Sequence, residues 1–460
     1  MKHKIMRGGI TCLVIAILMS IISAQEPNND ISFVNHVPQF GEFWAKYFGL
    51  LPTEEALSAA IATDGNYLIA GYTKVGSSGG VDGYAMKLST TGNIIWRTVF
   101  GGSLADYGTS IAATADGGCI VAGHGKSFGI GGMDAIAIKL NASGSVVWKR
   151  AYGGSTGDDS FYSIVTTPDG GYVAAGDTDS FGAGALDAFV VKLDASGNIV
   201  WARTVGGAAD DDALTIAQTS DGGYVTAGNT RSAGSGGPDM MVLRFTSIGQ
   251  GILRRTYGSK GWDRGMSIAQ APDGNYVLTG YTLAFGVGNL DILMLKITPL
   301  GSILWKRTFG GPKNEMSLSV APAPCGFYAI AGYTASFGKG LADILVMLVD
   351  SNGTVQRRRT FGSTGDDYSY AIAPTPDNNY LIAASTNSYG GGNFDNFIIK
   401  LDAIMELPGC NLSAIPPLTQ TIPNALVTIP PLVMTAPSVK TINPSITVTT
   451  PIITLGNACP

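Results

Sequence analysis

The sequence predicts an all-β fold made of seven repeated antiparallel units, and three observations support this prediction. Glycine, which breaks helices, accounts for 63 of the 460 residues, while hydrophobic residues still make up 45% and charged residues only 14%. A pattern of about 52 residues recurs seven times along the chain. Each copy contains four short runs rich in β-branched and aromatic residues, separated by turn-forming residues. A disordered chain would be less apolar and more charged, so the composition excludes one.

Three registers share this period. The first is an aspartate that precedes an apolar run, at Asp82, Asp134, Asp187, Asp239, Asp291, Asp343 and Asp395. The second is a turn position, at Asp64, Asp116, Asp169, Asp221, Asp273, Cys325 and Asp377. The third is a small residue, at Gly71, Gly123, Gly176, Gly228, Gly280, Gly332 and Ala384. Four antiparallel strands in each of seven copies indicate a seven-bladed β-propeller of four-stranded blades, with a linear β-solenoid as the competing fold.

The third copy shows the expected strands most clearly, over residues 161–166, 172–176, 188–193 and 199–205. Asp169-Gly170 and Ser196-Gly197 supply the positive φ angles that tight hairpins need. In the sixth and seventh copies the Asp-Gly turn is lost, at Cys325 and at Asn378. We therefore expect atypical turns in these two copies.

The ends of the repeat region predict how the ring closes. The fourth run of the first copy contains Trp96 and Phe100, and the seventh copy has no such run. The same pattern occurs 52 residues earlier, at Trp44 and Phe48. We expect residues 40–49 to provide the fourth strand of blade seven, so that both ends of the repeat region meet in one blade.

The repeat also carries a family resemblance. Residues 169–201 read Asp-Gly-Gly-Tyr-Val…Ala-Gly…Ser-Phe-Gly…Asp…Lys-Leu-Asp-Ala-Ser-Gly-Asn…Trp. This pattern resembles the SBBP-type β-propeller repeats of secreted prokaryotic proteins, and the resemblance covers residues 40 to about 402. It implies an exported or cell-surface propeller and implies little about the ligand.

The first residues predict export. Lys2, Lys4 and Arg7 precede an apolar run over residues 10–22, and Ala24 follows as a small residue. This arrangement is typical of a secretory signal peptide over residues 1–24, with an uncleaved anchor as the alternative. Loss of the three basic residues would take the formal charge from −5 to −8. After an N-terminal linker over residues 25–39, we expect a propeller over residues 40–410 in a secreted or cell-surface protein.

Residues 411–460 form a separate tail rich in Pro, Thr, Ile and Val. Prolines stand at 416, 423, 430, 437, 444 and 451, which is a spacing of seven throughout. Proline in every heptad excludes a continuous helix, and the β-branched neighbours favour extended structure. The tail is too apolar for a simple stalk. We expect it to pack against the propeller, to stack on itself, or to associate with another chain or the cell surface.

Four cysteines follow the predicted signal peptide. Cys410 and Cys459 bracket the heptads, and export permits a disulfide between them, so we treat this pair as a candidate disulfide. Cys119 and Cys325 belong to different blades and different strand registers. We expect both of these cysteines to be free.

An acid stands ten residues before each turn position, at Glu54, Asp106, Asp159, Asp211, Asp263, Glu315 and Asp367. If the first strands are innermost, these acids form a ring near the mouth of the central channel, on the face that carries the long glycine-rich loops. Such a ring could bind Ca²⁺ or attract a cationic partner. The alternative is that each acid accepts backbone N–H bonds and caps a turn. We expect no cofactor other than Ca²⁺ at this ring.

Positions that break the repeat are better ligand candidates than positions that obey it. One place after the glycine register, the residues differ from copy to copy: Tyr72, His124, Asp177, Asn229, Tyr281, Tyr333 and Ser385. They could line an asymmetric pocket with aromatic platforms, or they could simply be exposed to solvent. The sequence contains no Gly-x-Ser-x-Gly elbow, zinc-ligand spacing or phosphate loop, so we assign no catalytic residue.

These observations favour an exported, non-enzymatic propeller that acts as a binding or scaffold module for an extracellular protein or glycan. The formal charge of −5, with three histidines in all, argues against nucleic acid as a partner. The competing function is an extracellular polysaccharide-acting enzyme that uses acids on the loop face. One asymmetric acid pair in a deep cleft would favour the enzyme, and a flat symmetric ring would favour binding.

Overall fold

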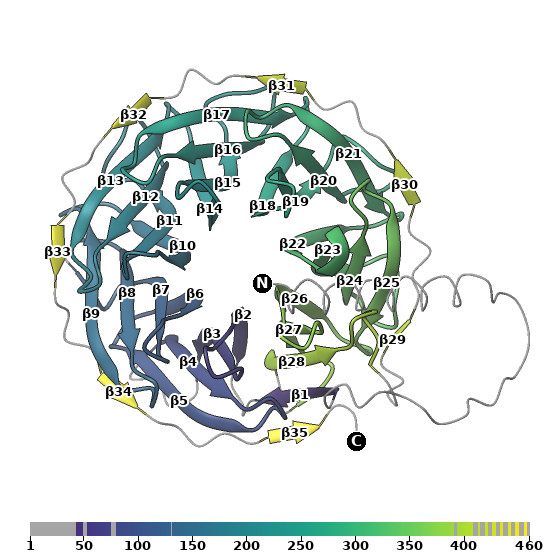
Figure 1. The fold of residues 1–460 in the computed structure, drawn as a ribbon, viewed down its shortest axis with the longest axis horizontal. Helices are drawn as coiled ribbons and strands as arrows, with labels where there is room; N and C mark the ends of the chain where they lie inside the picture. Colours follow the sequence, from purple (N-terminus) through teal and green to yellow (C-terminus); the bar gives the residue numbers. More distant parts are fainter. Residues whose placement is uncertain are drawn as a thin grey trace, which may run out of the picture.

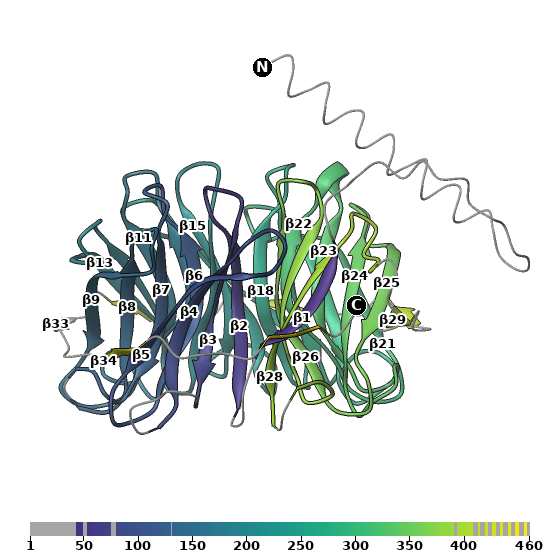
Figure 2. The ribbon, with the colours of Figure 1, turned by 90° about the horizontal axis from the view of Figure 1, so that it is seen from below.

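The computed structural model describes residues 43–48, 53–74, 80–129, 131–390 and 393–407, together with seven short strands in the tail. In this part of the chain the helical structure consists of η1 (Pro324–Gly326), and the rest is strand, turn and bend. Seven antiparallel sheets are arranged around a central axis (Figure 1), and their strands run along that axis (Figure 2). The predicted seven-bladed β-propeller is confirmed.

Each blade contains four strands in chain order from the axis to the rim, except that β1 is the outermost of these in blade seven (Figure 1). The innermost strands are β2 (Glu54–Ile61), β6 (Asp106–Ala113), β10 (Asp159–Thr166), β14 (Asp211–Gln218), β18 (Asp263–Gln270), β22 (Glu315–Pro322) and β26 (Asp367–Pro374). The second strands are β3 (Tyr67–Thr73), β7 (Cys119–Gly125), β11 (Tyr172–Thr178), β15 (Tyr224–Thr230), β19 (Tyr276–Thr282), β23 (Tyr328–Thr334) and β27 (Tyr380–Thr386).

The third and fourth strands complete each blade. The third strands are β4 (Asp82–Leu88), β8 (Asp134–Leu140), β12 (Asp187–Leu193), β16 (Asp239–Phe245), β20 (Asp291–Ile297), β24 (Asp343–Val349) and β28 (Asp395–Leu401). The fourth strands are β5 (Ile94–Gly101), β9 (Val146–Gly153), β13 (Ile199–Gly206), β17 (Gly251–Gly258), β21 (Ile303–Gly310), β25 (Val355–Phe361) and β1 (Trp44–Phe48).

The ring closes as the sequence predicts. Strand β1 pairs antiparallel with β28, and Trp44 lies opposite Lys400. The Trp44 ring packs near Tyr67 of blade one, with 6.1 Å between the ring centroids, and its Nε1 donates to the Thr90 carbonyl oxygen at 3.0 Å. The N-terminal strand therefore completes blade seven and also ties it to blade one.

The hydrophobic core lies between neighbouring blades. The buried apolar residues of the described chain form seven clusters, and each cluster joins the facing sides of two adjacent blades. The third strands are packed on both sides, which is why a strand such as β12 is buried at all seven positions and reads as a nearly continuous apolar run.

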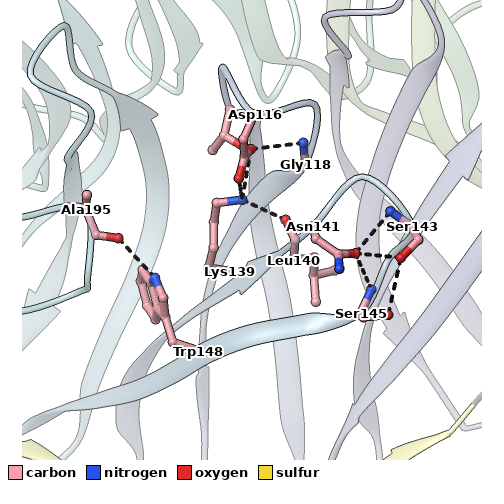
Figure 3. A network of polar contacts seen from close by, with 10 residues as sticks. Asp116, Gly118, Lys139, Leu140, Asn141, Ser143, Ser145, Trp148 and Ala195 are labelled. Carbon is pink, nitrogen blue, oxygen red and sulfur yellow. Dashed lines mark hydrogen bonds and ion pairs between the residues drawn. The ribbon is translucent and has the colours of Figure 1, made fainter.

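In all blades except four and six, a tryptophan of the outer strand is hydrogen-bonded to a turn of the next blade. Trp148 Nε1 donates to the Ala195 carbonyl oxygen at 3.1 Å (Figure 3). The same bond recurs between Trp96 and Ala142, Trp201 and Ser247, and Trp305 and Ser351. Two places along the strand, Arg203 Nε donates to the Gly249 carbonyl oxygen at 2.8 Å. The repeated tryptophan and the basic residue beside it are therefore parts of the interface between blades.

The turn-position aspartates have a repeated structural partner. In blade two, Asp116 forms an ion pair with Lys139 of β8 at 2.8 Å, and it accepts the Gly118 N–H (Figure 3). Equivalent pairs join Asp64 to Lys87, Asp169 to Lys192, Asp273 to Lys296 and Asp377 to Lys400. An aspartate thus recurs at the turn position because it stabilises the hairpin between the first two strands and ties that hairpin to the third strand.

The turns of the last two blades are atypical, as expected. Cys325 and Asn378 both adopt a φ of +63°. Cys119 is buried and free, which confirms one expectation. The expectation of a free Cys325 is wrong, because Cys325 is disulfide-bonded. Its partner lies outside the described residues, as do Cys410 and Cys459.

Cys325 lies near a segment that follows the seventh repeat, and the blade registers do not relate it to that segment. The turn that carries Cys325 is packed beside the chain that leads into the tail. Phe327, which follows the turn, and Leu407, just before the tail, contact the same core cluster. This contact joins the sixth repeat to a segment outside the repeats, so the 52-residue spacing does not reveal it.

The described parts of the tail are short strands that add a fifth strand to every blade (Figure 1). They are β29 (Ser413–Ala414), β30 (Thr419–Thr421), β31 (Leu426–Thr428), β32 (Val433–Thr435), β33 (Lys440–Ile442), β34 (Thr447–Thr449) and β35 (Leu455–Asn457). We call these seven strands the belt. Of the alternatives weighed for the tail, the structure shows packing against the propeller.

The predicted signal peptide and the linker that follows it lie outside the described residues. Within the described ranges, no helix has the length and apolar character needed to cross a membrane.

Candidate functional site

The seven acids of the predicted ring each begin an innermost strand, and all of them are buried. Asp211 is typical: its Oδ2 accepts the Gly207 N–H at 2.8 Å and the Ser232 hydroxyl at 2.6 Å. Asp159 makes the same contacts with Gly154 and Ser180. These are the contacts of the loop-capping alternative. We call the set the capping acids: Glu54, Asp106, Asp159, Asp211, Asp263, Glu315 and Asp367.

Burial raises the pKa of five capping acids, Asp106, Asp159, Asp211, Asp263 and Asp367, while hydrogen bonds to hydroxyls and loop amides oppose the shift. Glu54 differs because it forms an ion pair with the buried Arg97 at 2.5 Å. Among the residues that the structure describes, no group of three or more His, Cys, Asp or Glu side chains is placed to share one metal ion. The capping acids are thus arranged as separate loop supports.

The aspartates that begin the third strands hold the neighbouring glycine-rich loops. Asp239 Oδ2 accepts the Ser235 N–H at 2.6 Å, and Asp343 Oδ2 accepts the N–H groups of Lys339 and Gly340 at 3.0 and 2.9 Å. Burial raises the pKa of Asp239 and of Asp343 to about 6, and the nearby capping acids Asp263 and Asp367 add to the shift.

The residue that follows each capping acid differs from blade to blade. It lies opposite one of the varied second-strand positions, such as Tyr72 in blade one. The pairs are Glu55 and Tyr72, Tyr107 and His124, Ser160 and Asp177, Asp212 and Asn229, Arg264 and Tyr281, Met316 and Tyr333, and Tyr368 and Ser385. We call these pairs, together with Tyr162 and Tyr370, the axial ring.

The structure brings all of the varied positions together in this ring. Asp177, Asn229, Tyr281 and Ser385 are buried, and the other three are half-buried. Free exposure to solvent, which was the alternative interpretation, is therefore wrong. Most of the varied side chains instead contact another member of the ring.

One arc of the axial ring is aromatic and spans blades one to three. Tyr72 and Tyr107 meet edge to face, with 5.2 Å between their centroids. His124 follows at 5.1 Å from Tyr107, and Tyr162 at 6.0 Å from His124. Burial lowers the pKa of His124 to about 4, although nearby Asp158 opposes the shift. At neutral pH this arc is therefore uncharged.

A second aromatic arc occupies blades six and seven. Tyr333 and Tyr368 are 4.8 Å apart between centroids, and Phe394 lies 5.7 Å beyond Tyr368. Glu55 joins the two arcs across the junction of blades seven and one. Its Oε2 accepts the Tyr370 hydroxyl at 2.9 Å, and its Oε1 accepts the hydroxyl of Tyr72.

The remaining part of the axial ring, in blades three to five, carries charged groups of both signs. The Tyr162 hydroxyl donates to Asp177 Oδ2 at 3.0 Å. Asp212 accepts two bonds from the Asn229 amide, at 2.9 and 3.1 Å, and forms an ion pair with Arg264 at 3.5 Å. We call this part the charged arc.

Burial raises the pKa of Asp177 to about 7, and the negative charges of Asp212 and Asp159 add to the shift, while the Tyr162 hydroxyl opposes it. Burial also raises the pKa of Asp212, which Asn229 and Arg264 oppose. The two carboxylates thus stand in different environments: one has only hydroxyl partners, and the other has an amide and a guanidinium. The charged arc therefore contains two acids that differ in their hydrogen-bond partners.

A cavity of about 460 Å³ lies beside the outer strand β17 of blade four, away from the axial ring. It is lined by Val205, Leu243, Phe245 and residues 251–255. The axial ring combines aromatic faces, carboxylates and one guanidinium, which is chemistry suited to recognition of a polar or cationic group.

Sequence reasoning missed the first-strand partners Tyr107, Arg264 and Tyr368, and also the bulge residues Tyr162 and Tyr370. The signal was available, because these residues too differ between copies while their neighbours repeat. The bulge that turns Tyr162 and Tyr370 out of register is a backbone feature that the period alone does not reveal.

No protein-family model matches the chain, and no curated protein resembles it in sequence. Several solved structures are distantly similar. Sqt1 from Chaetomium thermophilum is 13% identical with a TM-score of 0.42, and the match covers 81% of this chain and 88% of Sqt1. A Dyadobacter fermentans protein of unknown function is 11% identical with a TM-score of 0.41, covering 78% and 94% of the two chains.

A puromycin hydrolase is 15% identical with a TM-score of 0.45, and the match covers 79% of this chain and 53% of the hydrolase. At this level of similarity, none of these structures indicates a ligand or an activity for this chain.

Proposed function

We propose that the chain is an exported, non-enzymatic binding module of the SBBP type, and that the axial ring is its recognition surface. The observation that carries the proposal is the contrast between adjacent registers. The capping acids recur at one position in every blade and are bonded to loop amides, hydroxyls or, for Glu54, Arg97. The axial ring instead offers a different residue pair in each blade. The leader-like residues 1–24 support a secreted or cell-surface location.

The charged arc favours a cationic ligand. Asp158 and Asp210 directly precede the capping acids Asp159 and Asp211 in the chain and add negative charge to blades three and four. Arg264 and Arg231 offset part of this charge through ion pairs of 3.5 Å each. Tyrosine faces on both sides of the charged arc add cation–π attraction to the attraction of the carboxylates. A positively charged group that enters the ring therefore meets both kinds of partner.

Burial of the carboxylates favours a protein over a glycan. Asp177 is only 6% exposed, and the side chain of Asp212 only 16%. Lysine and arginine carry their charge on long flexible stems and can reach recessed acids, whereas the amine of an amino sugar is attached directly to a bulky ring. The partner that fits best is an exposed, lysine- or arginine-bearing segment of an extracellular protein.

The test is binding of fluorescent lysine-rich and glutamate-rich decapeptides to the mature protein. We expect the lysine-rich peptide alone to bind, more weakly as salt rises. Asp212→Asn should weaken binding about tenfold, which corresponds to about 1.4 kcal/mol. Asp194→Asn is the matched control, because Asn141 naturally fills the same turn register in blade two. Equal binding of both peptides, or equal effects of the two variants, would refute the proposal.

The acid pair of the charged arc supports a second candidate, a polysaccharide hydrolase. A glycosidase needs two carboxyl groups in different environments, one to donate a proton and one to act as base or nucleophile. Asp177 has hydroxyl partners, whereas Asp212 has the Asn229 amide and the Arg264 guanidinium. Reducing ends released from a polysaccharide panel would reveal such activity. Activity that is lost in both Asp177→Asn and Asp212→Asn, but kept in Asp194→Asn, would replace the binding proposal by this one.

A further inference from the structure

The belt follows the rim of the propeller in a fixed way. Its strands pair with the last residues of the outer strands: β31 with Thr256–Gly258, β32 with Thr204–Gly206 and β34 with Val99–Gly101. The order of pairing is the reverse of the order of the blades in the chain, from blade six down to blade one and then to blade seven. The last strand, β35, pairs with β1, which is thereby held on both sides.

The period of the tail matches the spacing of the blades. One heptad takes the chain from one outer strand to the next, and seven extended residues reach at most about 24 Å. All prolines of the heptad register fall between the belt strands, where no ladder donor is needed. The seven-residue spacing that excludes a coiled coil is thus explained by one pairing segment for each blade.

The outer strands need such a cover. An uncovered edge strand presents free N–H and C=O groups that can pair with another chain. The stretches that precede the belt contacts also carry exposed apolar side chains in one register: Ile95, Val147, Val200, Ile252 and Leu304, which are 45–60% exposed. An open polar backbone edge beside an apolar row is a typical site of strand-to-strand association.

We propose that the belt is an intramolecular cover that prevents the seven outer edges from pairing with a second copy of this chain. The second copy is the fitting partner because an antiparallel pair of identical strands is self-complementary about a two-fold axis. All seven edges have the same register, so any uncovered edge matches any other. With the belt in place, the outermost strand of each blade is only two or three residues long and offers little backbone for pairing. Release of the belt exposes the longer outer strands, through which the chain then associates at its rim.

The experiment uses the full-length mature chain with proline placed at the centre of belt strands. Val427→Pro opens blade four, and Gln420→Pro, Val427→Pro, Met434→Pro, Thr441→Pro and Val448→Pro together open blades one to five. Asn424→Pro is the matched control, because Pro417 and Pro431 already fill this register in the neighbouring heptads. Amide exchange reports each edge, and sedimentation velocity reports association.

We expect Val427→Pro to raise amide exchange in residues 256–258 and not in residues 204–206 or in the inner strands. The five-proline variant should form dimers and larger species at micromolar concentration, while the parent and Asn424→Pro stay monomeric. A synthetic peptide of residues 419–435 should reduce this association by covering open edges. Unchanged exchange would show that the belt does not protect the edges, and open edges in a chain that stays monomeric would equally overturn the proposal.

Discussion

Asp211 and Asp212 are neighbours on β14, yet they belong to different parts of the molecule. Asp211 is one of seven equivalent capping acids, is 1% exposed and supports a loop through Gly207 and Ser232. Asp212 has no equivalent in most blades, and it contacts Asn229 and Arg264 in the axial ring. In a repeat protein, a residue that recurs in every copy supports structure that all copies share. A residue that occurs in only one copy does not, so its role must be sought in contacts specific to that copy.

The same contrast separates Glu54 from Glu55. Glu54 is buried in an ion pair with Arg97, whereas Glu55 accepts hydroxyl bonds from tyrosines of two different blades. The negative charge of the loop face is therefore divided between two roles. Most of it stabilises loops, and a smaller part lies in the axial ring, where it can act on a ligand. The predictions below test this division from the largest expected effect to the smallest.

The repeat-conforming residues should dominate stability, and the closing strand most of all. Deletion of residues 43–48 removes the buried Trp44 and Phe48 together with a full strand pairing. Large buried aromatic residues contribute about 3–5 kcal/mol each, so we expect the melting temperature to fall by about 10 °C or more. Deletion of residues 25–42 alone is the control. Equal melting curves for the two deletions would contradict closure by β1.

The pair Asp211 and Asp212 gives the sharpest comparison. Asp211→Ala removes the acceptor of the Gly207 N–H and one of the two acceptors of the Ser232 hydroxyl, and should cost about 2 kcal/mol of unfolding free energy. Asp212→Asn should cost about 1 kcal/mol or less, because the amide oxygen can still accept from Asn229, and because Arg264 keeps its contact with Tyr281 and is partly exposed. Urea denaturation of both variants measures this. The reverse order would show that the axial ring, and not the capping acids, supports the fold.

Acidic pH should stabilise the protein. The pKa values of Asp177, about 7, and of Asp239 and Asp343, about 6, are raised above their unfolded values. The folded state then binds more protons than the unfolded state, so stability falls as pH rises through the folded pKa. We expect the melting temperature to decrease by several degrees between pH 5 and pH 8. Asp239→Asn should flatten this slope, and a melting temperature that rises over the same range would contradict the raised pKa values.

Calcium should have the smallest effect. Each capping acid is already bonded to loop amides, hydroxyls or Arg97, so millimolar Ca²⁺ should change the melting temperature by less than about 1 °C. A clear rise in the melting temperature would assign a calcium site to these acids. In that case the double variant Asp159→Asn and Asp211→Asn should abolish the rise, whereas Asp194→Asn should keep it.

The fold could be predicted because the evidence for it was repeated seven times. A single Asp-Gly turn says little, but turns and strands at one spacing determine the number of blades, and Trp44 determines how they close. The site could be predicted only in part. Tyr72 and Asp177 stood out as departures from the repeat, but the partners that give them their chemistry, such as Tyr162 and Glu55, come from neighbouring strands or neighbouring blades. These contacts depend on the geometry between strands.

The tail and Cys325 show a second limit. The heptads indicated extended structure with an apolar surface, yet the sequence left three places where that surface could be covered. The match between one heptad and one blade becomes evident only when both repeats are seen in space. Cys325 was misjudged for a related reason: its turn packs near residues that follow the seventh repeat, such as Leu407, and no register within the repeat region shows that proximity.

The position of β1 has a consequence for how the molecule is made. This strand is the first part of the ring to leave the ribosome or the export channel, but both of its neighbours, β28 and β35, come from the far end of the chain. Strand β1 stays unpaired until almost the whole polypeptide has emerged, and such long-range pairing makes folding slow. Strand β35 therefore covers β1 only after the chain has been made as far as residue 457. A chain that stops short can build several blades, but it leaves its own beginning open on one side.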